Sequence, residues 1–342
     1  LELLEKSSMK QIQELQQIKG DAYDYYIAGN EDTDLFEKIF LVDDIVEEIC
    51  KPDKYFLIGE KGSGKTAYSV YMSKSDKIDS FCSISLVENT LYQRFLNMKK
   101  QKTLELSSYK DVWINLIYLI LAENIRKEYG ESLFSSIKYK QLSKAIDVFY
   151  SDAFKPEFVN AFEFVDNASA SINSMMKQGL FSANGKSTVE SSQKYIEQSY
   201  QISLMKIRDG FEKAFASINL KKPTILFVDG IDARPRDIDN EQYFECLVGL
   251  VNAVLEMNQS FLKEKQIKVM LLIRPDIMYK MPVHNMNQKL RNNSVLLDWV
   301  TSYRKYIDSK LFKIADDYFM KQQDTTYELG ECWNYYFPYK VE

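Results

Sequence analysis

The sequence predicts an α/β fold: a parallel sheet of about five strands, flanked by helices and interrupted by a large helical insertion. Short apolar runs of strand length alternate with segments of helical periodicity, which is typical of a parallel sheet covered on both faces. From about residue 90 to 218 no segment has the pattern of a comparable strand, and the pattern is mainly helical. A glycine-rich segment, GEKGSGKT at 59–66, separates the first strand from the helix after it.

The composition is that of a globular protein with an ordinary core. The 342 residues are 45% hydrophobic, which excludes disorder over most of the chain. A formal net charge of −5 provides no overall attraction to nucleic acid or to anionic membranes. The apolar run VWINLIYLILA at 112–122 is too short to span a bilayer, which needs about 18–20 residues. We therefore expect no membrane association.

The cysteines indicate a reducing cytoplasm rather than a metal centre. The chain has one histidine, His284, and four cysteines far apart in sequence, with no C-x-x-C pair. A structural zinc site needs about four such ligands at close spacing, so none is expected. The cysteines are Cys50, Cys82, Cys246 and Cys332.

The N-terminal third is predicted to contain two helices before the glycine-rich segment and two strands around it. The first twenty residues have the pattern of a charged amphipathic helix rather than a secretory signal. A second helix follows the polar turn GNEDTD and is expected to end before Pro52. The expected elements are helices over 1–20 and 34–50, a strand over 54–59, a helix over 65–73 and a strand over 81–86.

The insertion is predicted to be helical around a polar centre. Its strongest helix, YKDVWINLIYLILAENIRKEYG, is expected to stop at Gly130. Further helices are expected over 143–154 and 190–217, with a polar, loop-rich segment over 168–190.

The chain then returns to apolar strands alternating with helices. PTILFVDG at 223–230 and IKVMLLIRPD at 267–276 have the continuous apolar character of fully buried strands, and SVLLDW at 294–299 predicts a short fifth strand. Helices are expected over 240–264 and 300–318, before an aromatic segment at 319–342. The first of these helices is expected to turn inward Tyr243, Leu247, Leu250, Val251, Val254 and Leu255.

The segment GEKGSGKT matches the G-x-x-x-x-G-K-[ST] pattern of a phosphate-binding loop, in the expected context between a strand and a helix. Gly59, Gly62 and Gly64 allow the backbone to point several amide N–H groups at phosphate oxygens. Lys65 is expected to reach the β and γ phosphates, and the Thr66 hydroxyl to ligate Mg²⁺. The alternative is a glycine-rich turn that carries a lysine. The nucleotide-binding candidates are Gly59, Glu60, Lys61, Gly62, Ser63, Gly64, Lys65, Thr66 and Ala67.

An acidic residue ends the buried strand ILFVD. Asp229 is expected to hold magnesium through water, although an aspartate can also simply cap a turn at the end of a strand. Many ATPases place a glutamate directly after this aspartate, where this chain has Gly230. Asp232 is therefore the candidate for orienting the attacking water. Its alternative role is a turn aspartate paired with Arg234 or Arg236.

A charged residue also ends the next buried strand. Arg274 in LLIRPD needs a partner, because a charge at the end of an apolar strand is costly when unpaired. The candidates are the γ-phosphate, the carboxylate that binds water, or a salt bridge to Asp276 or Asp229. Arg234 and Arg236 are alternatives that would act on a neighbouring subunit. The candidate catalytic residues are Lys65, Asp229, Asp232 and Arg274, with Thr66 and Asp229 as metal ligands.

Together these motifs resemble the AAA-like branch of P-loop ATPases, close to the STAND and KAP groups. FVDGID at 227–232 is similar to the hhhhDGLD second motif of STAND enzymes. VDGIDARP, IRPDI, NNSVLLDW and YFP are similar to an uncharacterised bacterial P-loop ATPase family with some members in mobile or defence-related loci. The resemblance covers about residues 20–340 and implies the sheet order 5-1-4-3-2. The chain departs from STAND enzymes at Ala233, where they often carry an acid, and no further helical module is evident by residue 342.

The resemblance implies a cytoplasmic, magnesium-dependent ATPase with ATP and Mg²⁺ as cofactors. Hydrolysis would drive a conformational or assembly switch, as in a sensor or regulator of bacterial conflict with phage or mobile elements. A homo-oligomer through the ATPase core is expected, and the insertion is expected either to contact a protein partner or to pack on the core as a lid. The expected parts are helices that pack on the core (1–50), the ATPase core (51–90 and 219–318), the insertion (91–218) and an aromatic segment (319–342) that a truncation could shorten.

Two other function classes stay open at this point. A nucleic-acid-remodelling ATPase would use basic stretches at 98–103, 135–144 and 279–293, although the net charge does not indicate nucleic acid. A kinase would share the phosphate-binding loop but needs an acceptor site that the sequence does not reveal.

Overall fold

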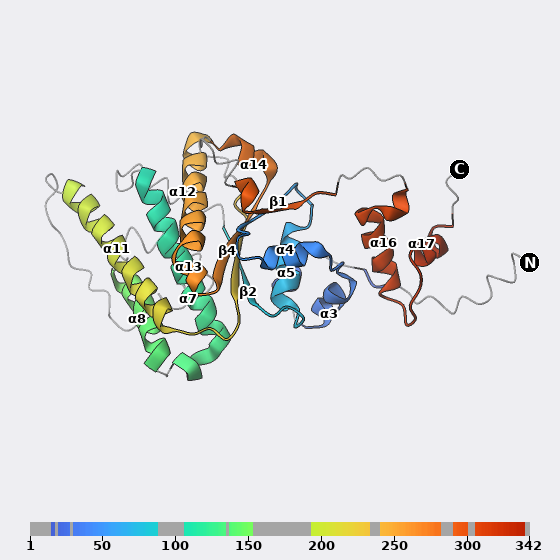
Figure 1. The fold of residues 1–342 in the computed structure, drawn as a ribbon, viewed down its shortest axis with the longest axis horizontal. Coiled ribbons are helices and arrows are strands. Elements are labelled where there is room, and N and C mark those ends of the chain that lie inside the picture. Colours follow the sequence, from blue (N-terminus) through green and yellow to red (C-terminus); the bar gives the residue numbers. More distant parts are fainter. Residues whose placement is uncertain are drawn as a thin grey trace, which may run out of the picture. The chain divides into compact units, whose positions relative to one another are not determined.

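The computed structural model describes residues 15–17, 20–27, 30–87, 106–134, 137–152, 193–232, 240–281, 290–299 and 305–338. It is an α/β fold with a five-stranded parallel sheet flanked by helices (Figure 1). The sheet order is β2-β3-β4-β1-β5, which is the order 5-1-4-3-2 read from the other edge. The helix expected over 1–20 and the loop expected over 168–190 lie largely or wholly outside the described residues.

The strands lie close to the ranges expected from the sequence. Their register pairs Ile58 with Ile273, Val228 with Leu271, and Leu86 with Asp229, all in parallel. Carboxyl ends of parallel strands lie at the same edge of a sheet, and ligands of open α/β sheets bind at that edge. The strands are β1 (Phe56–Gly59), β2 (Phe81–Leu86), β3 (Thr224–Asp229), β4 (Ile267–Ile273) and β5 (Ser294–Leu297).

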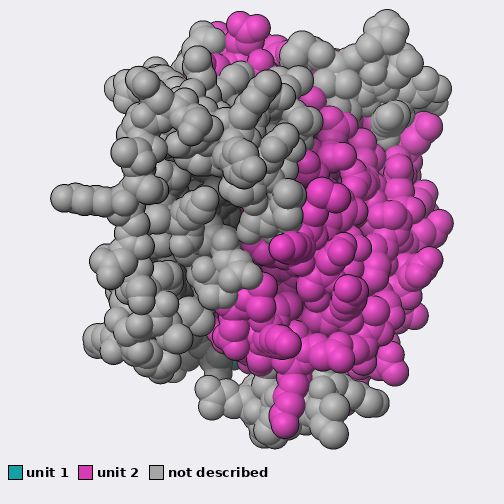
Figure 2. Space-filling view, turned by 90° about the vertical axis from the view of Figure 1, so that its left-hand side faces the viewer, with its two compact units in different colours: residues 1–50, 59–78, 296–342 teal, residues 51–58, 79–295 magenta. Residues whose placement is uncertain are grey.

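The chain divides into two compact units, which we describe separately. Unit 1 contains Leu1–Cys50, Gly59–Ile78 and Leu296–Glu342, and unit 2 contains Lys51–Ile58 and Asp79–Val295 (Figure 2, magenta for unit 2). The sequence analysis divided the chain into four parts by their expected function, whereas the two units are defined by compact packing. The four-part division therefore stays a prediction.

Unit 2 is organised around helix α7, whose middle part is buried on all sides. Helix α7 packs against α8, α11 and α12, and its segment from Tyr109 to Ile125 contributes eleven buried hydrophobic residues to the core (Figure 1). The Trp113 indole N–H donates to the Cys246 carbonyl of α12 over 3.1 Å. All six residues expected to face inward on α12 are buried, as predicted. The helices are α7 (Leu106–Phe134), α8 (Ile137–Asp152), α11 (Gln193–Ser217), α12 (Asn240–Gln259), α13 (Phe261–Glu264) and α14 (Pro275–Lys280).

Unit 1 gathers the helix after the glycine-rich segment with the two ends of the chain. Phe40 stacks on Tyr71 of α5, with ring centroids 4.3 Å apart, and meets Tyr68 edge-on. The Lys310 ammonium of α16 lies 3.3 Å from a carboxylate oxygen of Asp43. The Asp316 carboxylate accepts hydrogen bonds from the N–H groups of Gly330 and Trp333. The helices are α2 (Ala22–Ile27), α3 (Asn30–Ile39), α4 (Asp44–Cys50), α5 (Lys65–Lys74), η1 (Tyr306–Asp308), α16 (Lys310–Met320) and α17 (Glu331–Tyr336).

Several helix predictions were wrong in their boundaries. The helix expected over 240–264 is two helices, α12 and α13, which Ser260 separates. The helix expected over 34–50 is two helices, because the Asp43 side chain accepts from the Ile45 N–H and starts α4 anew. Helix α7 continues past Gly130, where a stop was predicted. The helix expected from 300 begins at Lys310, where Ser309 accepts from the Phe312 N–H as its N-cap. None of the helices described is long and apolar enough to cross a membrane.

Candidate functional site

The glycine-rich segment forms a tight loop between β1 and α5. Gly62 and Gly64 have φ angles of 81° and 90°, in the left-handed region that side chains other than glycine rarely adopt. Gly64 is also the residue that precedes the first turn of α5. The loop therefore has the strand, turn and helix context that the motif requires.

Gly59 is required by close packing rather than by its backbone angle. A Cβ atom at this position would lie 2.3 Å from the Ser63 hydroxyl oxygen and 3.0 Å from the Leu297 Cβ of β5. The loop thus folds back over the end of its own strand, and Leu297 lies against it.

Lys65 is buried within the loop, with 9% of its surface exposed. Its ammonium donates to the Gly59 carbonyl over 2.8 Å and to the Glu60 carbonyl over 3.0 Å. A buried ammonium needs such partners, because desolvating the charge is costly. These two partners are neutral carbonyls, so an anionic phosphate would offer the ammonium a stronger, charge-assisted hydrogen bond.

Ser63 lies at the centre of the loop. Its N–H donates to the Glu60 carbonyl over 3.1 Å, and its carbonyl accepts from the Trp299 indole N–H over 2.8 Å. Its hydroxyl is buried and has no hydrogen-bond partner among the residues that the structure describes. An unpaired buried hydroxyl costs about 1–3 kcal/mol. The loop therefore holds a polar atom whose hydrogen-bonding capacity is unused.

Tyr68 of helix α5 connects the helix to Asp43. The Tyr68 hydroxyl donates to the Asp43 carboxylate over 2.9 Å. Burial and the charge of Asp43 both raise the pKa of Tyr68 above its ordinary value, so the hydroxyl stays a donor. This contact fixes the helix that begins at the loop.

The second group of candidates lies in unit 2, in the turn that follows β3. The Asp229 carboxylate accepts from the Gly230 N–H over 2.7 Å, and its carbonyl accepts from the Val87 N–H over 2.8 Å. Gly230 has a φ of 81°, and a Cβ there would lie 2.9 Å from the Val87 carbonyl oxygen. This turn accepts only glycine after Asp229, which explains why no acid stands at that position.

The structure brings Asp232 and Arg274 together in unit 2. The Arg274 guanidinium makes a two-point contact with Asp276, each N···O distance being 2.9 Å, and its third nitrogen lies 3.8 Å from Asp232. The sequence predicted that Arg274 ends the strand, and this was wrong. Strand β4 stops at Ile273, and Arg274 is the N-cap residue of α14. Pro275 accounts for the difference, because it cannot donate to a strand ladder but fits the first turn of a helix.

Sequence reasoning named Asp276 only as one of several partners for Arg274. The structure shows it as the main partner, and adds Trp299, whose contact with Ser63 the sequence did not predict. The sequence patterns around Asp276 and Trp299 give little indication of these contacts, because an aspartate in the first turn of a helix and a tryptophan after a strand are both common. Arg234, Arg236, the basic stretch 98–103 and most of the stretch 279–293 lie outside the described residues.

Thr66 in unit 1 and Asp229 in unit 2 each offer an oxygen donor of the kind that Mg²⁺ prefers. Within the described ranges no group of three or more His, Cys, Asp or Glu side chains is arranged to hold a metal ion. Mg²⁺ is commonly bound by one or two protein oxygens together with phosphates and waters. The Thr66 hydroxyl in the first turn of α5 and the Asp229 carboxylate at the end of β3 are oxygen donors of this kind.

No protein-family model matches this chain, and no curated protein and no solved structure matches it either. The features of the chain that bear on its function are therefore the motif, the sheet order and the geometry of the loop.

Proposed function

We propose that the protein binds Mg–ATP at the loop 59–67 and hydrolyses it, as a P-loop ATPase of the AAA-like type. The observation that carries the proposal is the loop itself. It joins β1 to α5 with left-handed glycines at positions 62 and 64, and it surrounds the buried ammonium of Lys65. The unpaired hydroxyl of Ser63 supports it, since a phosphate oxygen would satisfy that group.

In this proposal each residue has a distinct role. Loop N–H groups and the N-terminus of α5 bind the phosphates, and Lys65 binds the β and γ phosphates. Thr66 ligates Mg²⁺, and Asp229 holds it through water. The sheet order supports the assignment of Asp229, because β4 alone separates β1 from β3 and the three strands run parallel.

Hydrolysis is assigned to Asp232 and Arg274. Asp232 is the first acid after Asp229, and the turn at Gly230 excludes an acid directly after Asp229. It would orient the attacking water, and Arg274, 3.8 Å away, would respond to the γ-phosphate. The magnesium ion would neutralise the charge that develops on the phosphates.

The use of the ATP is proposed from the resemblance alone. We place it in a conformational or assembly switch of a cytoplasmic sensor or regulator, with self-association through the ATPase core. Light scattering with and without Mg–ATP tests the self-association. A protein partner at the insertion is proposed on the same ground. No observation within the described residues favours the nucleic-acid or kinase alternatives.

Phosphate release with Mg–ATP tests the proposed hydrolysis, and Asp232→Asn is the informative variant. The amide keeps the size of the side chain but cannot accept a proton from water. We expect ATP affinity within about twofold of wild type and turnover lower by about 10²–10⁴-fold. Asp79→Asn is the control, because Asp79 is an exposed residue paired at 3.5 Å with Lys222. Near-normal turnover of Asp232→Asn would remove Asp232 from catalysis, and no turnover by wild type would contradict hydrolysis itself.

A further inference from the structure

We propose that Trp299 is a positioning residue of the phosphate-binding loop, holding the Gly64 N–H in the orientation that binds phosphate. This inference rests on the proposed function, since it assigns Trp299 a part in nucleotide binding. The contact behind it is the hydrogen bond from the Trp299 indole N–H to the Ser63 carbonyl, 2.8 Å long and spanning 236 residues of sequence.

The geometry of a peptide bond connects Trp299 to Gly64. In a trans peptide the carbonyl of one residue and the N–H of the next point in opposite directions. With the Ser63 carbonyl bonded to Trp299, the Gly64 N–H points away from the indole. Backbone N–H groups of such glycine-rich loops bind phosphate oxygens, so the bond from Trp299 fixes the direction of one of these candidate donors.

This peptide unit has little restraint of its own. It is followed by Gly64 at a φ of 90°, and Gly62 at 81° stands one residue before Ser63. Glycine adopts many backbone conformations, so the unit between residues 63 and 64 can rotate at small steric cost. A hydrogen bond from outside the loop is therefore an effective way to hold it in one orientation.

The end of β5 supports the loop at a second point. Leu297, two residues before Trp299, is buried and lies close to Gly59. Leu297, Trp299 and the loop all belong to unit 1, so the contact is internal to one compact unit. The last residue of β5 thus lies against the first glycine of the loop, and Trp299, two residues further on, bonds to its central peptide.

The test is a nucleotide titration of the full chain with Trp299→Phe, which keeps an aromatic ring and removes the N–H donor. We expect Mg–ADP and Mg–ATP to bind about tenfold more weakly than to wild type, as for the loss of one hydrogen bond. In steady-state turnover the KM for ATP should rise by a similar factor with kcat within about threefold, because the bond serves ground state and transition state alike.

Trp113→Phe is a matched control. It removes the same kind of bond, indole N–H to a backbone carbonyl, in the core between α7 and α12. We expect a lower melting temperature for this variant with nucleotide affinity unchanged within about twofold. Hydrogen exchange of nucleotide-free Trp299→Phe should be faster in peptides covering 59–67 and unchanged in those covering α7 and α12.

Three results would overturn the inference. Wild-type nucleotide affinity in Trp299→Phe would show that the bond does not position the loop. Faster exchange throughout Trp299→Phe would show a general structural role instead. Absence of nucleotide binding by wild type would remove the proposed function, and the inference with it. The first two results leave that function standing.

Discussion

At the scale of single residues, the turn after β3 decides where a catalytic acid can stand. Gly230 is left-handed, and a Cβ atom at this position would lie 2.9 Å from the Val87 carbonyl oxygen, so a glutamate here would clash with backbone. The acid required by the proposal must come from further along the chain. Asp232 meets that condition and has the cation Arg274 beside it.

Asp276 is expected to set the orientation of Arg274 through its two-point contact. Asp276→Asn keeps the shape of the partner and removes its charge, which leaves the guanidinium less neutralised and less firmly oriented. We predict that kcat falls by about tenfold while the KM for ATP does not rise. Steady-state phosphate release measures both parameters, with Asp79→Asn as control. A raised KM with unchanged kcat would show that Asp276 affects binding rather than orientation.

The residues of the loop were predictable from the sequence because the motif is local. Eight consecutive residues specify the turn, and the structure shows left-handed glycines at 62 and 64 and the Lys65 ammonium bonded to the Gly59 carbonyl. The contact of Trp299 with Ser63 was not predicted, and the proximity of Asp232 to Arg274 was only one of several partnerships that the sequence left open. They join positions 236 and 42 residues apart, so they depend on how the strands pair rather than on any local pattern.

At the scale of elements, the strands were predicted better than the helix ends. A buried parallel strand is a continuous apolar run, and all five runs became strands within about three residues of the expected ends. Helix ends depend on competing local effects. Gly130 was expected to stop α7, but glycine costs a helix only about 1 kcal/mol, and the buried face of α7 outweighs it.

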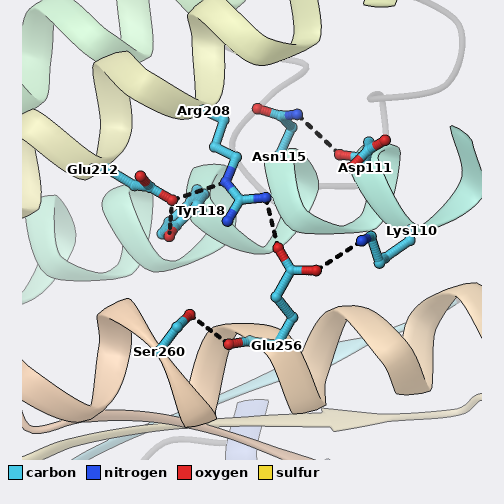
Figure 3. A network of polar contacts seen from close by, with 8 residues as sticks. All are labelled: Lys110, Asp111, Asn115, Tyr118, Arg208, Glu212, Glu256 and Ser260. Atoms are coloured by element: carbon cyan, nitrogen blue, oxygen red, sulfur yellow. Dashed lines mark hydrogen bonds and ion pairs between the residues drawn. The ribbon is translucent and has the colours of Figure 1, made fainter.

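A polar network joins helices α7, α11 and α12 of unit 2, in addition to their packing in the core (Figure 3). Arg208 of α11 binds Glu256 of α12 and Glu212, each over 2.8 Å, and Lys110 of α7 lies 2.7 Å from Glu256. Burial acts to raise the pKa of Glu256, but the hydrogen bonds from Lys110 and Arg208 outweigh it and hold that pKa below its ordinary value. The charged form of Glu256 is therefore stabilised by folding.

Glu256→Gln tests this network through stability. Because these side chains are about one third exposed, solvent screening reduces the effect, and we predict a loss of about 1–2 kcal/mol near pH 7. A carboxylate with a lowered folded pKa stabilises above its unfolded pKa and loses that effect as pH falls through the folded value. The difference between wild type and variant should therefore be constant above about pH 5 and shrink below pH 4.5, the ordinary value.

Urea unfolding at several pH values measures this difference. Glu264→Gln, which changes an exposed glutamate on α13, is the matched control and should leave stability within about 0.5 kcal/mol. A difference for Glu256→Gln that stays constant down to pH 3 would show that the charge of Glu256 is not the source of its effect.

At the scale of the whole molecule, the observed strand order is the one that the family resemblance of the motifs implied. The resemblance implied 5-1-4-3-2, and the strands pair in that order. The division into two units follows chain packing that no local pattern encodes, since residues 59–78 belong with the two ends of the chain. The resemblance therefore implied the strand order, but nothing in the sequence indicated which segments form each compact unit.

The central claim is that the loop 59–67 binds a nucleoside triphosphate, and calorimetric titration of Mg–ATP tests it most directly. The account predicts saturable one-site binding by wild type and by Lys77→Ala, an exposed lysine beyond α5. It predicts binding at least about 100-fold weaker, or none, for Lys65→Ala, which loses the charge-assisted bond to phosphate. Chelating the magnesium should weaken ATP binding to wild type. Equal binding of Mg–ATP by wild type and Lys65→Ala would contradict the account.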